Sequence, residues 1–467
     1  MRSNVAKAIV VVAAVTAVAA WLRLDDLGRP GRKVFDEIYY ASDGCWYSGI
    51  DYQDCGLDQD VERSWVHPPL GKVLIAAGID AFGNRPFGWR VSAALAGTLT
   101  VALAGVLAFL LFGSWIWAGV GALLVGSEHL LFVQSRISML DVFLAMFVVA
   151  GFMFLVWDRV RRDRERHDEV VEHTPAVDGE DPWLDAPPEE HTEPVRAFRP
   201  RPLRLLAGAS MGAATAVKWS GLFALAGAVL LSLWWESRRG RRPGVSRLPA
   251  RLGSAIVALG FSALVVYVAS WAPWLPDRGG DLAELASHHV DMAEYHRELD
   301  TVNDDGEPAH PYMSRAWEWP LMLRPVAYHW EGDAATGQEI LAIGNPVIVW
   351  GGFLVLPFVV AGAVRRRDWR GSAIAVPILV QYLPWLAVTR PLFLFYLTPV
   401  TPFLALALTA AARSVSAMKL GTRRLVAPAA LIVVLGVLAF AFFWPVLTAN
   451  TLSLDDWRAR IWFSSWV

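Results

Sequence analysis

The chain has 467 residues, of which 55% are hydrophobic and 18% are charged, and its net charge is −2. Soluble globular proteins usually carry about 25% charged residues, so this composition indicates a membrane protein and argues against a soluble enzyme. The basic clusters flank apolar runs, as membrane topology requires, so nucleic-acid binding has no support.

The first apolar run covers Val5–Leu22. We interpret it as a retained membrane span, because no clear small-residue cleavage site accompanies it and many spans follow. With ten further runs it predicts an all-α polytopic membrane protein with about eleven transmembrane helices. The further runs are Trp89–Phe112, Ser114–Phe132, Ile137–Trp157, Leu203–Val217, Ser220–Trp235, Leu252–Trp271, Pro346–Val364, Ser372–Val388, Leu392–Ala412 and Leu425–Val446.

Three polar segments separate these runs. Residues 23–88 and 276–344 form two large loops, and Asp281–Leu299 in the second predicts an amphipathic helix. Residues 158–202 are rich in Arg, Glu, His and Pro, which predicts a mostly disordered insert. We see no internal repeat, so a transporter built from inverted halves has little support.

Positive charge predicts the orientation of the chain. If the N-terminus is cytoplasmic, every basic cluster falls in a cytoplasmic loop, as the positive-inside rule requires. Both large loops and the C-terminal tail then lie outside the cytoplasm. The basic clusters are at residues 159–166, 238–242, 365–367 and 413–424.

The two cysteines, Cys45 and Cys55, both lie in the first large loop. An extracytoplasmic loop favours a disulfide between them; two free thiols are the alternative. Metal-binding cysteine spacing is absent from the sequence, and His289 and His296 on the predicted outer helix lack an acidic or cysteine partner at fixed spacing. We therefore expect no metal site.

Two adjacent carboxylates, Asp36 and Glu37, lie among aromatic residues in the first large loop. Adjacent side chains diverge by about 100° on a helix and about 180° on a strand, so we expect two separate jobs rather than one shared proton. One carboxylate would face a reacting atom and the other a binding partner. The alternative is a helix start, with acids at the positive end of the helix dipole.

Several cations fall at the predicted outer ends of spans: Arg90, Arg136, Lys218 and Arg390. A charge there either snorkels to the lipid headgroups or lines a polar cavity. Arg and Lys bind phosphate well. Cations opposite an acidic outer loop therefore predict an enzyme that uses a lipid-linked phosphate donor.

An ordered set of short motifs covers nearly the whole chain. The motifs are Phe35-Asp36-Glu37, His67-Pro68-Pro69-Leu70-Gly71-Lys72, Trp89-Arg90, Ser135-Arg136 with Leu140-Asp141, Lys218-Trp219-Ser220-Gly221-Leu222, His310-Pro311-Tyr312 with Trp319-Pro320 and Arg324-Pro325, Gly344-Asn345-Pro346, and Arg390 with Phe395-Tyr396 and Pro399. In this ordered set the chain resembles the protein O-mannosyltransferases, a family of GT-C membrane glycosyltransferases. The second large loop is too short for the MIR domain of eukaryotic members, which resembles the bacterial, actinobacterial-type branch.

The resemblance implies the GT-C fold and a glycosyltransferase at the plasma membrane. It would transfer mannose from polyprenyl-phosphate mannose to Ser or Thr hydroxyls of secreted proteins, outside the cytoplasm and with inversion. No resident cofactor is expected, because the lipid-linked donor is a co-substrate. Membrane lipids and, as a hypothesis, the secretion translocon are further partners.

The resemblance also assigns roles to residues. Asp36 is expected to act as general base or hydroxyl-orienting group, and Glu37 to position the acceptor peptide. The candidates for the donor phosphate are Arg90, Lys218 and Arg390, with Lys72 a weaker one. Substrate binding and a structural role both stay open for His67, Arg136, Asp141, His310, Tyr312 and Asn345.

Structural alternatives are specific for two of these residues. We expect Asp141 to pair with a nearby Arg such as Arg136. For Asn345, the structural alternative to a functional role is a simple cap of the next span. Among whole-protein alternatives, a GT-C enzyme with another sugar or with a lipid or glycan acceptor would share this architecture. A secondary transporter would instead place ionisable groups in mid-span, and an inactive scaffold is a third alternative.

Overall fold

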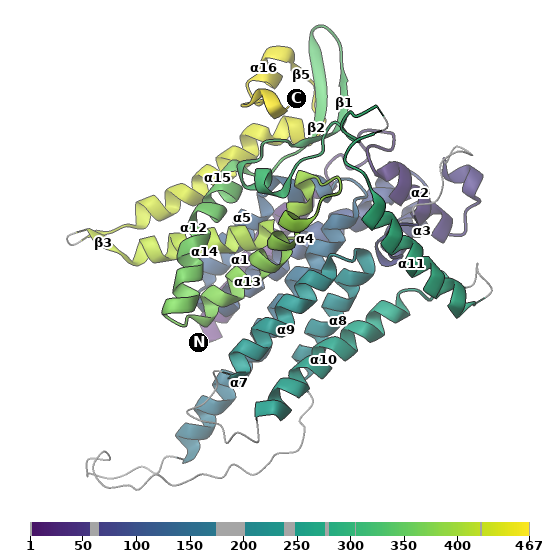
Figure 1. The fold of residues 1–467 in the computed structure, drawn as a ribbon. Coiled ribbons are helices and arrows are strands. Elements are labelled where there is room, and N and C mark those ends of the chain that lie inside the picture. The colour runs from purple at the N-terminus through teal and green to yellow at the C-terminus, as the bar shows by residue number, and fades with distance from the viewer. Residues whose placement is uncertain are drawn as a thin grey trace, which may run out of the picture.

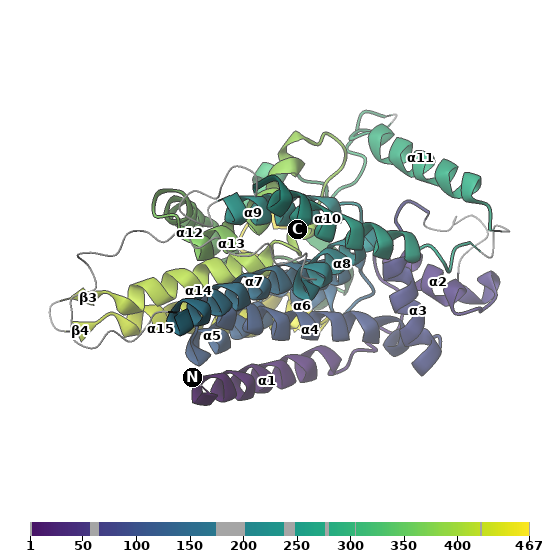
Figure 2. The same cartoon turned by 90° about the horizontal axis from the view of Figure 1, so that it is seen from below.

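The computed structural model describes residues 2–56, 65–173, 201–237, 248–275, 280–303, 305–420 and 423–466. Long helices form a bundle, and the shorter outer elements gather toward one end of it (Figure 1). Figure 2 shows α2, α3 and α11 at that end, with the N-terminus, β3 and β4 at the opposite end.

Each predicted apolar run contains a helix. Among the described residues, five helices are long and apolar enough to cross a membrane: α1, α4, α7, α12 and α15. The helices of the bundle are α1 Arg2–Leu24, α4 Pro86–Phe112, α5 Trp115–Gly126, α7 Leu140–His173, α8 Pro202–Val217, α9 Gly221–Ser237, α10 Leu248–Ala269, α12 Pro346–Arg365, α13 Trp369–Tyr382, α14 Thr401–Ala417 and α15 Val426–Leu447.

Two predicted spans are shorter as helices than as apolar runs. The run Ser114–Phe132 breaks after α5, where the Glu128 carboxylate caps a separate short helix, α6 His129–Gln134. The run Leu392–Ala412 becomes α-helical only at Thr401, after the 3₁₀ turn η5 Leu394–Leu397. A 3₁₀ turn, η4 Leu383–Ala387, likewise ends the run that contains α13.

The polar insert begins later than predicted. We expected disorder over residues 158–202, but α7 continues to His173, so that prediction is wrong for the first part of the segment. Ion pairs one turn apart, such as Arg161 to Glu165 at 2.8 Å, support the helix beyond its apolar part. Residues 174–200 lie outside the described part of the chain.

In the described part of the first large loop, the chain forms the short helices α2 Glu37–Tyr47, η1 Tyr52–Cys55 and α3 Leu70–Phe82. The predicted disulfide joins Cys45 of α2 to Cys55 of η1, so the two-thiol alternative is wrong. The cross-link holds the end of α2 against the segment that follows it, which restricts the loop that begins at Asp36.

The second large loop contains the predicted amphipathic helix, α11 Leu282–Glu298, whose N-cap is Asp281. Met292 of this helix packs against Trp271 and Trp274, which follow α10. The loop also contains η3 Ala316–Leu321 and two antiparallel strands, β1 Val326–Gly332 and β2 Thr336–Ala342.

The tail after α15 returns to this outer sheet. Strand β5 Leu452–Ser453 pairs with β2 and gives the order β1-β2-β5. The tail continues through α16 Leu454–Arg458 and η6 Ser464–Trp466, and a small hairpin, β3 Lys419–Leu420 with β4 Arg423–Arg424, joins α14 to α15. These strands are an addition to a fold that is otherwise helical as predicted.

Glycine permits a close approach of two bundle helices. A Cβ at Gly208 would lie 2.8 Å from the Leu259 Cα, and one at Gly212 would lie 2.7 Å from the Ala263 Cα. The four-residue spacing places both glycines of α8 on one face toward α10. This contact holds α10, and with it the start of the second large loop, against the bundle.

We expect Gly212→Leu to lower the free energy of unfolding by about 1–3 kcal/mol, because the new side chain meets backbone atoms of α10. Thermal or denaturant unfolding in detergent measures the change. Gly260→Leu on α10 is the matched control, since a Cβ there meets no atom within 4 Å. Equal stability of the Gly212→Leu variant and the control would contradict this account of the helix contact.

Candidate functional site

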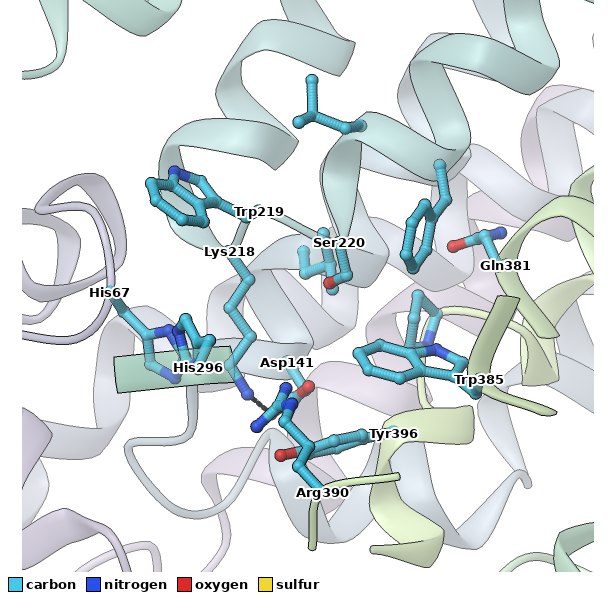
Figure 3. A pocket seen from close by; sticks show the side chains of 14 residues that line it. His67, Asp141, Lys218, Trp219, Ser220, His296, Gln381, Trp385, Arg390 and Tyr396 are labelled. Atoms are coloured by element: carbon cyan, nitrogen blue, oxygen red, sulfur yellow. Dashed lines mark hydrogen bonds and ion pairs between the residues drawn. The ribbon is translucent and has the colours of Figure 1, made fainter. Parts of the chain in front are cut away.

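A cavity of about 300 Å³ lies among the outer ends of α7, α8, α9 and α13, beside α11 (Figure 3). Its wall combines two cations, one carboxylate, two imidazoles and several aromatic rings. The lining residues are His67, Asp141, Leu144, Lys218, Trp219, Ser220, Leu222, Phe223, His296, Gln381, Trp385, Arg390, Tyr396 and Pro399.

Lys218 lies in the turn that follows α8, and its ammonium group donates a 2.7 Å hydrogen bond to Oδ2 of Asp141. Both side chains are buried. Asp141 therefore pairs with Lys218, and the predicted partner Arg136 is wrong. An ammonium group has three N–H donors, so the bond to Asp141 leaves donor capacity for a ligand in the cavity.

Arg390 supplies the second cation of the cavity wall. Its guanidinium carbon lies 5.8 Å from the ring centroid of Trp385 and 5.9 Å from that of Tyr396. No ion pair between Arg390 and a carboxylate is found among the described residues. Stacking on rings holds the guanidinium in place without using its charge, which leaves that charge for an anionic ligand.

Asp36 occupies the N-cap position of α2, but its side chain makes no capping hydrogen bond. The alternative that Asp36 serves only to start a helix therefore explains where the residue lies, but it gives the carboxylate no capping hydrogen bond. Burial is the main cause that raises the pKa of Asp36 to about 6, and the negative charge of Asp141 also raises it. The positive charge of Lys218 and a hydrogen bond from Tyr40 lower this pKa and so oppose the effect of burial. Asp36 thus lies within electrostatic reach of the Lys218–Asp141 pair, beside the cavity rather than in its lining.

The backbone just before Asp36 has an unusual conformation. Phe35 has φ of 48°, in the left-handed region that a residue other than glycine rarely adopts. Its ring lies 4.5 Å from Tyr328, 5.8 Å from Phe395 and 6.3 Å from His310, between ring centroids. Packing from three separate segments holds this conformation, and it sets the direction in which Asp36 leaves the loop.

Glu37 is fully buried and is not among the residues that line the cavity. Its carboxylate accepts hydrogen bonds from Arg90 at 2.8 and 2.7 Å, from the Val34 N–H at 3.0 Å and from the Ser138 N–H at 2.9 Å. These four bonds use the acceptor capacity of a carboxylate. The structure therefore gives Glu37 a structural role in place of the predicted contact with the acceptor peptide.

Arg90 is also fully buried, and all five of its N–H groups are engaged. Besides the two bonds to Glu37, it donates to three carbonyl groups of the segment between α1 and α2. The acceptors are the carbonyl oxygens of Leu27, Pro30 and Arg32, at 3.2, 2.9 and 3.0 Å. The predicted phosphate contact of Arg90 is therefore corrected to a structural one.

Three other predicted residues are also engaged in structure. Lys72 forms a buried 2.9 Å ion pair with Asp43. Arg136 donates hydrogen bonds to carbonyl oxygens at and just after the C-terminal end of α1, and so caps that end of the helix. Asn345 caps α12 and donates to the carbonyl groups of Ser127, just after α5, and of Gly436 in α15, which supports a structural role.

The remaining predicted residues divide between the cavity and its surroundings. His67 lines the cavity. His310 lies outside the lining, with its ring 5.0 Å from Phe393, and its Nδ1 accepts the backbone N–H of Tyr312 at 3.1 Å. His310 and Tyr312 therefore belong to the aromatic packing near Phe35.

Of the 14 lining residues, the sequence analysis had named His67, Asp141, Lys218 and Arg390 as site residues; those it missed include Trp219, His296, Trp385 and Tyr396. Trp219 and Tyr396 lie inside motifs that had been singled out, so adjacency to Lys218 and Arg390 was an available signal. Trp385 reads from sequence as an interfacial tryptophan. His296 was considered only as a metal ligand, and its place in the cavity depends on the docking of α11.

We expect Glu37→Gln to lower the free energy of unfolding by about 3–5 kcal/mol, because the Arg90 charge stays buried without its counter-charge. Unfolding in detergent measures the loss. Glu331→Gln is the matched control: its 3.2 Å pair with Arg32 is exposed and should contribute at most about 1 kcal/mol. A Glu37→Gln variant that keeps parental stability but loses activity would return Glu37 to the chemistry.

Two separate parts of the chain match models of known protein families. Residues 81–169 match the family dolichyl-phosphate-mannose-protein mannosyltransferase, and residues 282–466 match the C-terminal four TMM region of protein-O-mannosyltransferase. The polyprenol-phosphate-mannose–protein mannosyltransferase of Mycolicibacterium smegmatis is 31% identical over 97% of this chain and 92% of its own. The Mycobacterium tuberculosis protein of that name is 28% identical over 96% and 89%.

Solved structures show the same fold. The protein O-mannosyltransferase Pmt1-Pmt2 complex of S. cerevisiae, bound to the sugar donor, matches with a TM-score of 0.76 and 13% identity over 99% of this chain and 93% of its own. ArnT from Cupriavidus metallidurans, bound to undecaprenyl phosphate, matches with a TM-score of 0.51 and 18% identity over 97% and 72%. The predicted GT-C fold is confirmed, and the chain belongs to the protein O-mannosyltransferase family of membrane glycosyltransferases.

Proposed function

We propose that the protein transfers mannose from polyprenyl-phosphate mannose to Ser or Thr hydroxyls of secreted proteins. The observation that carries the proposal is the meeting of Asp36, the Lys218–Asp141 pair and Arg390 around one cavity. A base beside two cations is what glycosyl transfer from a phosphate donor requires. The names of the bacterial relatives support mannose, the lipid-linked donor and a protein acceptor.

The donor phosphate would bind between Lys218 and Arg390. Both cations line the cavity, and aromatic rings surround them: the Lys218 ammonium lies 5.3 Å from the Tyr396 ring, which also contacts Arg390. As the glycosidic bond breaks, negative charge grows on the leaving phosphate, and cations held in a water-poor site stabilise that charge. Asp141 fixes the direction of the Lys218 ammonium and so acts as a positioning residue.

Asp36 would accept the proton of the attacking hydroxyl. The acceptor oxygen forms a bond to the anomeric carbon, the bond from that carbon to the phosphate oxygen breaks, and the proton passes to the Asp36 carboxylate. A single displacement inverts the anomeric centre and needs one base and no enzyme nucleophile, by analogy with inverting glycosidases. The structural use of Glu37 supports a mechanism with one carboxylate base.

The setting of the reaction is part of the proposal. The basic clusters support a plasma-membrane protein with a cytoplasmic N-terminus and an extracytoplasmic site. Acceptors would arrive as extended Ser- or Thr-rich segments, since an unfolded hydroxyl reaches a recessed site more easily than a folded one; contact with the secretion translocon would supply them. Membrane lipids would surround the enzyme, and the reaction would need the lipid-linked donor but no resident cofactor.

We expect Asp36→Asn to lower mannose transfer at least about 100-fold, the scale expected when a general base is removed. The assay supplies labelled polyprenyl-phosphate mannose and a Ser/Thr-rich peptide to membranes that carry the protein. Asp51→Asn in the same loop is the control, since Asp51 is exposed and caps η1. Equal transfer by the parent and Asp36→Asn would place the base elsewhere, and label on a lipid or glycan would reject the protein acceptor.

The rate should also depend on the charge of Asp36. Because burial raises the pKa of this carboxyl to about 6, the base is ionised above that pH and protonated below it. We expect kcat/KM to fall about tenfold per pH unit as the pH drops below about 6. Residual transfer by Asp36→Asn should lack this acid limb; an identical limb in the variant would assign the titration to another group.

A further inference from the structure

Two imidazoles form one side of the cavity. His67 comes from the segment before α3 and His296 from the last turn of α11, and their rings stack with centroids 5.4 Å apart and an interplanar angle of 27°. Figure 3 shows the two rings together, on the side of Lys218 away from Trp385. Neither imidazole has a role in the reaction as described above.

The hydrogen bonds of His296 define which nitrogen carries the proton. Its Nε2 lies 2.9 Å from the carbonyl oxygen of Val66. A carbonyl oxygen only accepts hydrogen bonds, so Nε2 carries the hydrogen and Nδ1 of the neutral ring holds a lone pair. That Nδ1 is buried and has no hydrogen-bond partner among the described residues.

A buried acceptor without a partner costs free energy and calls for an explanation. His296 lines the cavity, although Nδ1 itself is closed off by its neighbours. A small shift of the His296 ring toward the cavity would let a hydroxyl of a ligand there donate to Nδ1. Burial, with Arg390 and Lys218 nearby, lowers the pKa of His296 to about 4, and the pKa of His67 is also lowered. The imidazoles are therefore neutral near pH 7, and Nδ1 stays an acceptor.

The two ends of the cavity suit different chemical groups. Lys218 and Arg390 attract an anion, whereas a lone pair at Nδ1 repels one and accepts from a neutral O–H group. Each end also has an aromatic ring, Trp219 beside His296 and Tyr396 beside the two cations, and the apolar face of a sugar ring can pack against such a ring. A glycosyl phosphate carries both a phosphate and ring hydroxyls, so it matches both ends at once.

We propose that His296, packed against His67, recognises a ring hydroxyl of the donor sugar by accepting its hydrogen bond at Nδ1. The proposal rests on the proposed function and deepens it, because it assigns the phosphate and the sugar to separate walls of one cavity. His296 is then a determinant of sugar specificity. The hydroxyl of the peptide acceptor has the same chemistry, and the experiment separates the two.

A second histidine of α11 provides a matched control. His289 lies seven residues earlier on the same helix, and both of its ring nitrogens have partners. Nε2 lies 2.8 Å from the Tyr267 hydroxyl, and Nδ1 lies 2.8 Å from the Leu285 carbonyl oxygen. His289 is outside the cavity lining, so its replacement tests the docking of α11 without removing an acceptor from the cavity.

The experiment compares the full chain with its His296→Phe and His289→Phe variants, each purified and reconstituted in nanodiscs. Binding is measured for polyprenyl-phosphate mannose and for polyprenyl phosphate, which has no sugar. His296→Phe should weaken binding of the mannose-bearing lipid about tenfold or more, because a sugar hydroxyl loses its acceptor in a buried site. Binding of polyprenyl phosphate should change less than about twofold, and His289→Phe should bind both lipids as the parent does.

His296→Gln serves as a second variant, because its amide oxygen restores an acceptor, and it should recover part of the lost affinity. Equal weakening for both lipids, or the same loss in His289→Phe, would overturn the proposal in favour of a packing role. Unchanged donor binding with a raised KM for the peptide would assign the hydroxyl to the acceptor and also overturn it. Mannose transfer by the parent is measured separately, and its absence would reject the proposed function. If the parent transfers mannose and His296→Phe binds the donor as tightly as the parent, this inference alone is rejected.

Discussion

The buried ion pair between Glu37 and Arg90 holds the first outer loop on the helical bundle. Arg90 gathers carbonyl groups of the segment after α1, while Glu37 accepts the Ser138 N–H just before α7. One pair of side chains thus joins α4, the entry of α7 and the loop that carries Asp36. Burying two charges costs free energy, and the hydrogen bonds that Glu37 and Arg90 make in this structure offset that cost.

The same pair explains how two adjacent carboxylates come to differ. Glu37 is held by its hydrogen bonds to Arg90, and Phe35 is held by aromatic rings from β1 and η5. Asp36 lies between these anchors and makes no cap for α2. Its carboxylate is therefore positioned by the anchored residues on either side and by a hydrogen bond from Tyr40, rather than by capping α2.

The charges of the cavity are arranged for use rather than for stability. Lys218 is paired with Asp141, and the charges of both residues act on the pKa of Asp36. Arg390 is held by an aromatic ring, that of Trp385, rather than by a carboxylate. A ligand that brings a phosphate and hydroxyls meets a cationic wall and a neutral imidazole wall in one small space. Asp141 lies on α7 and Lys218 in the turn after α8, whereas α11 brings His296 from a segment outside the bundle. Sugar recognition in our proposal therefore depends on how α11 docks.

The sequence by itself determined the class of protein, the placement of its apolar helices and the amphipathic helix α11, and it singled out Asp36, Lys218 and Arg390 as candidate site residues. Hydropathy and ordered motifs are local signals, so they survive without knowledge of the fold. Tertiary structure alone decided that Arg90 serves Glu37, that Asp141 pairs with Lys218 and that His296 reaches the cavity. Each of these depends on contacts between residues far apart in the chain. The sequence alone does not distinguish a buried cation that forms a structural ion pair from one that is free to bind a phosphate.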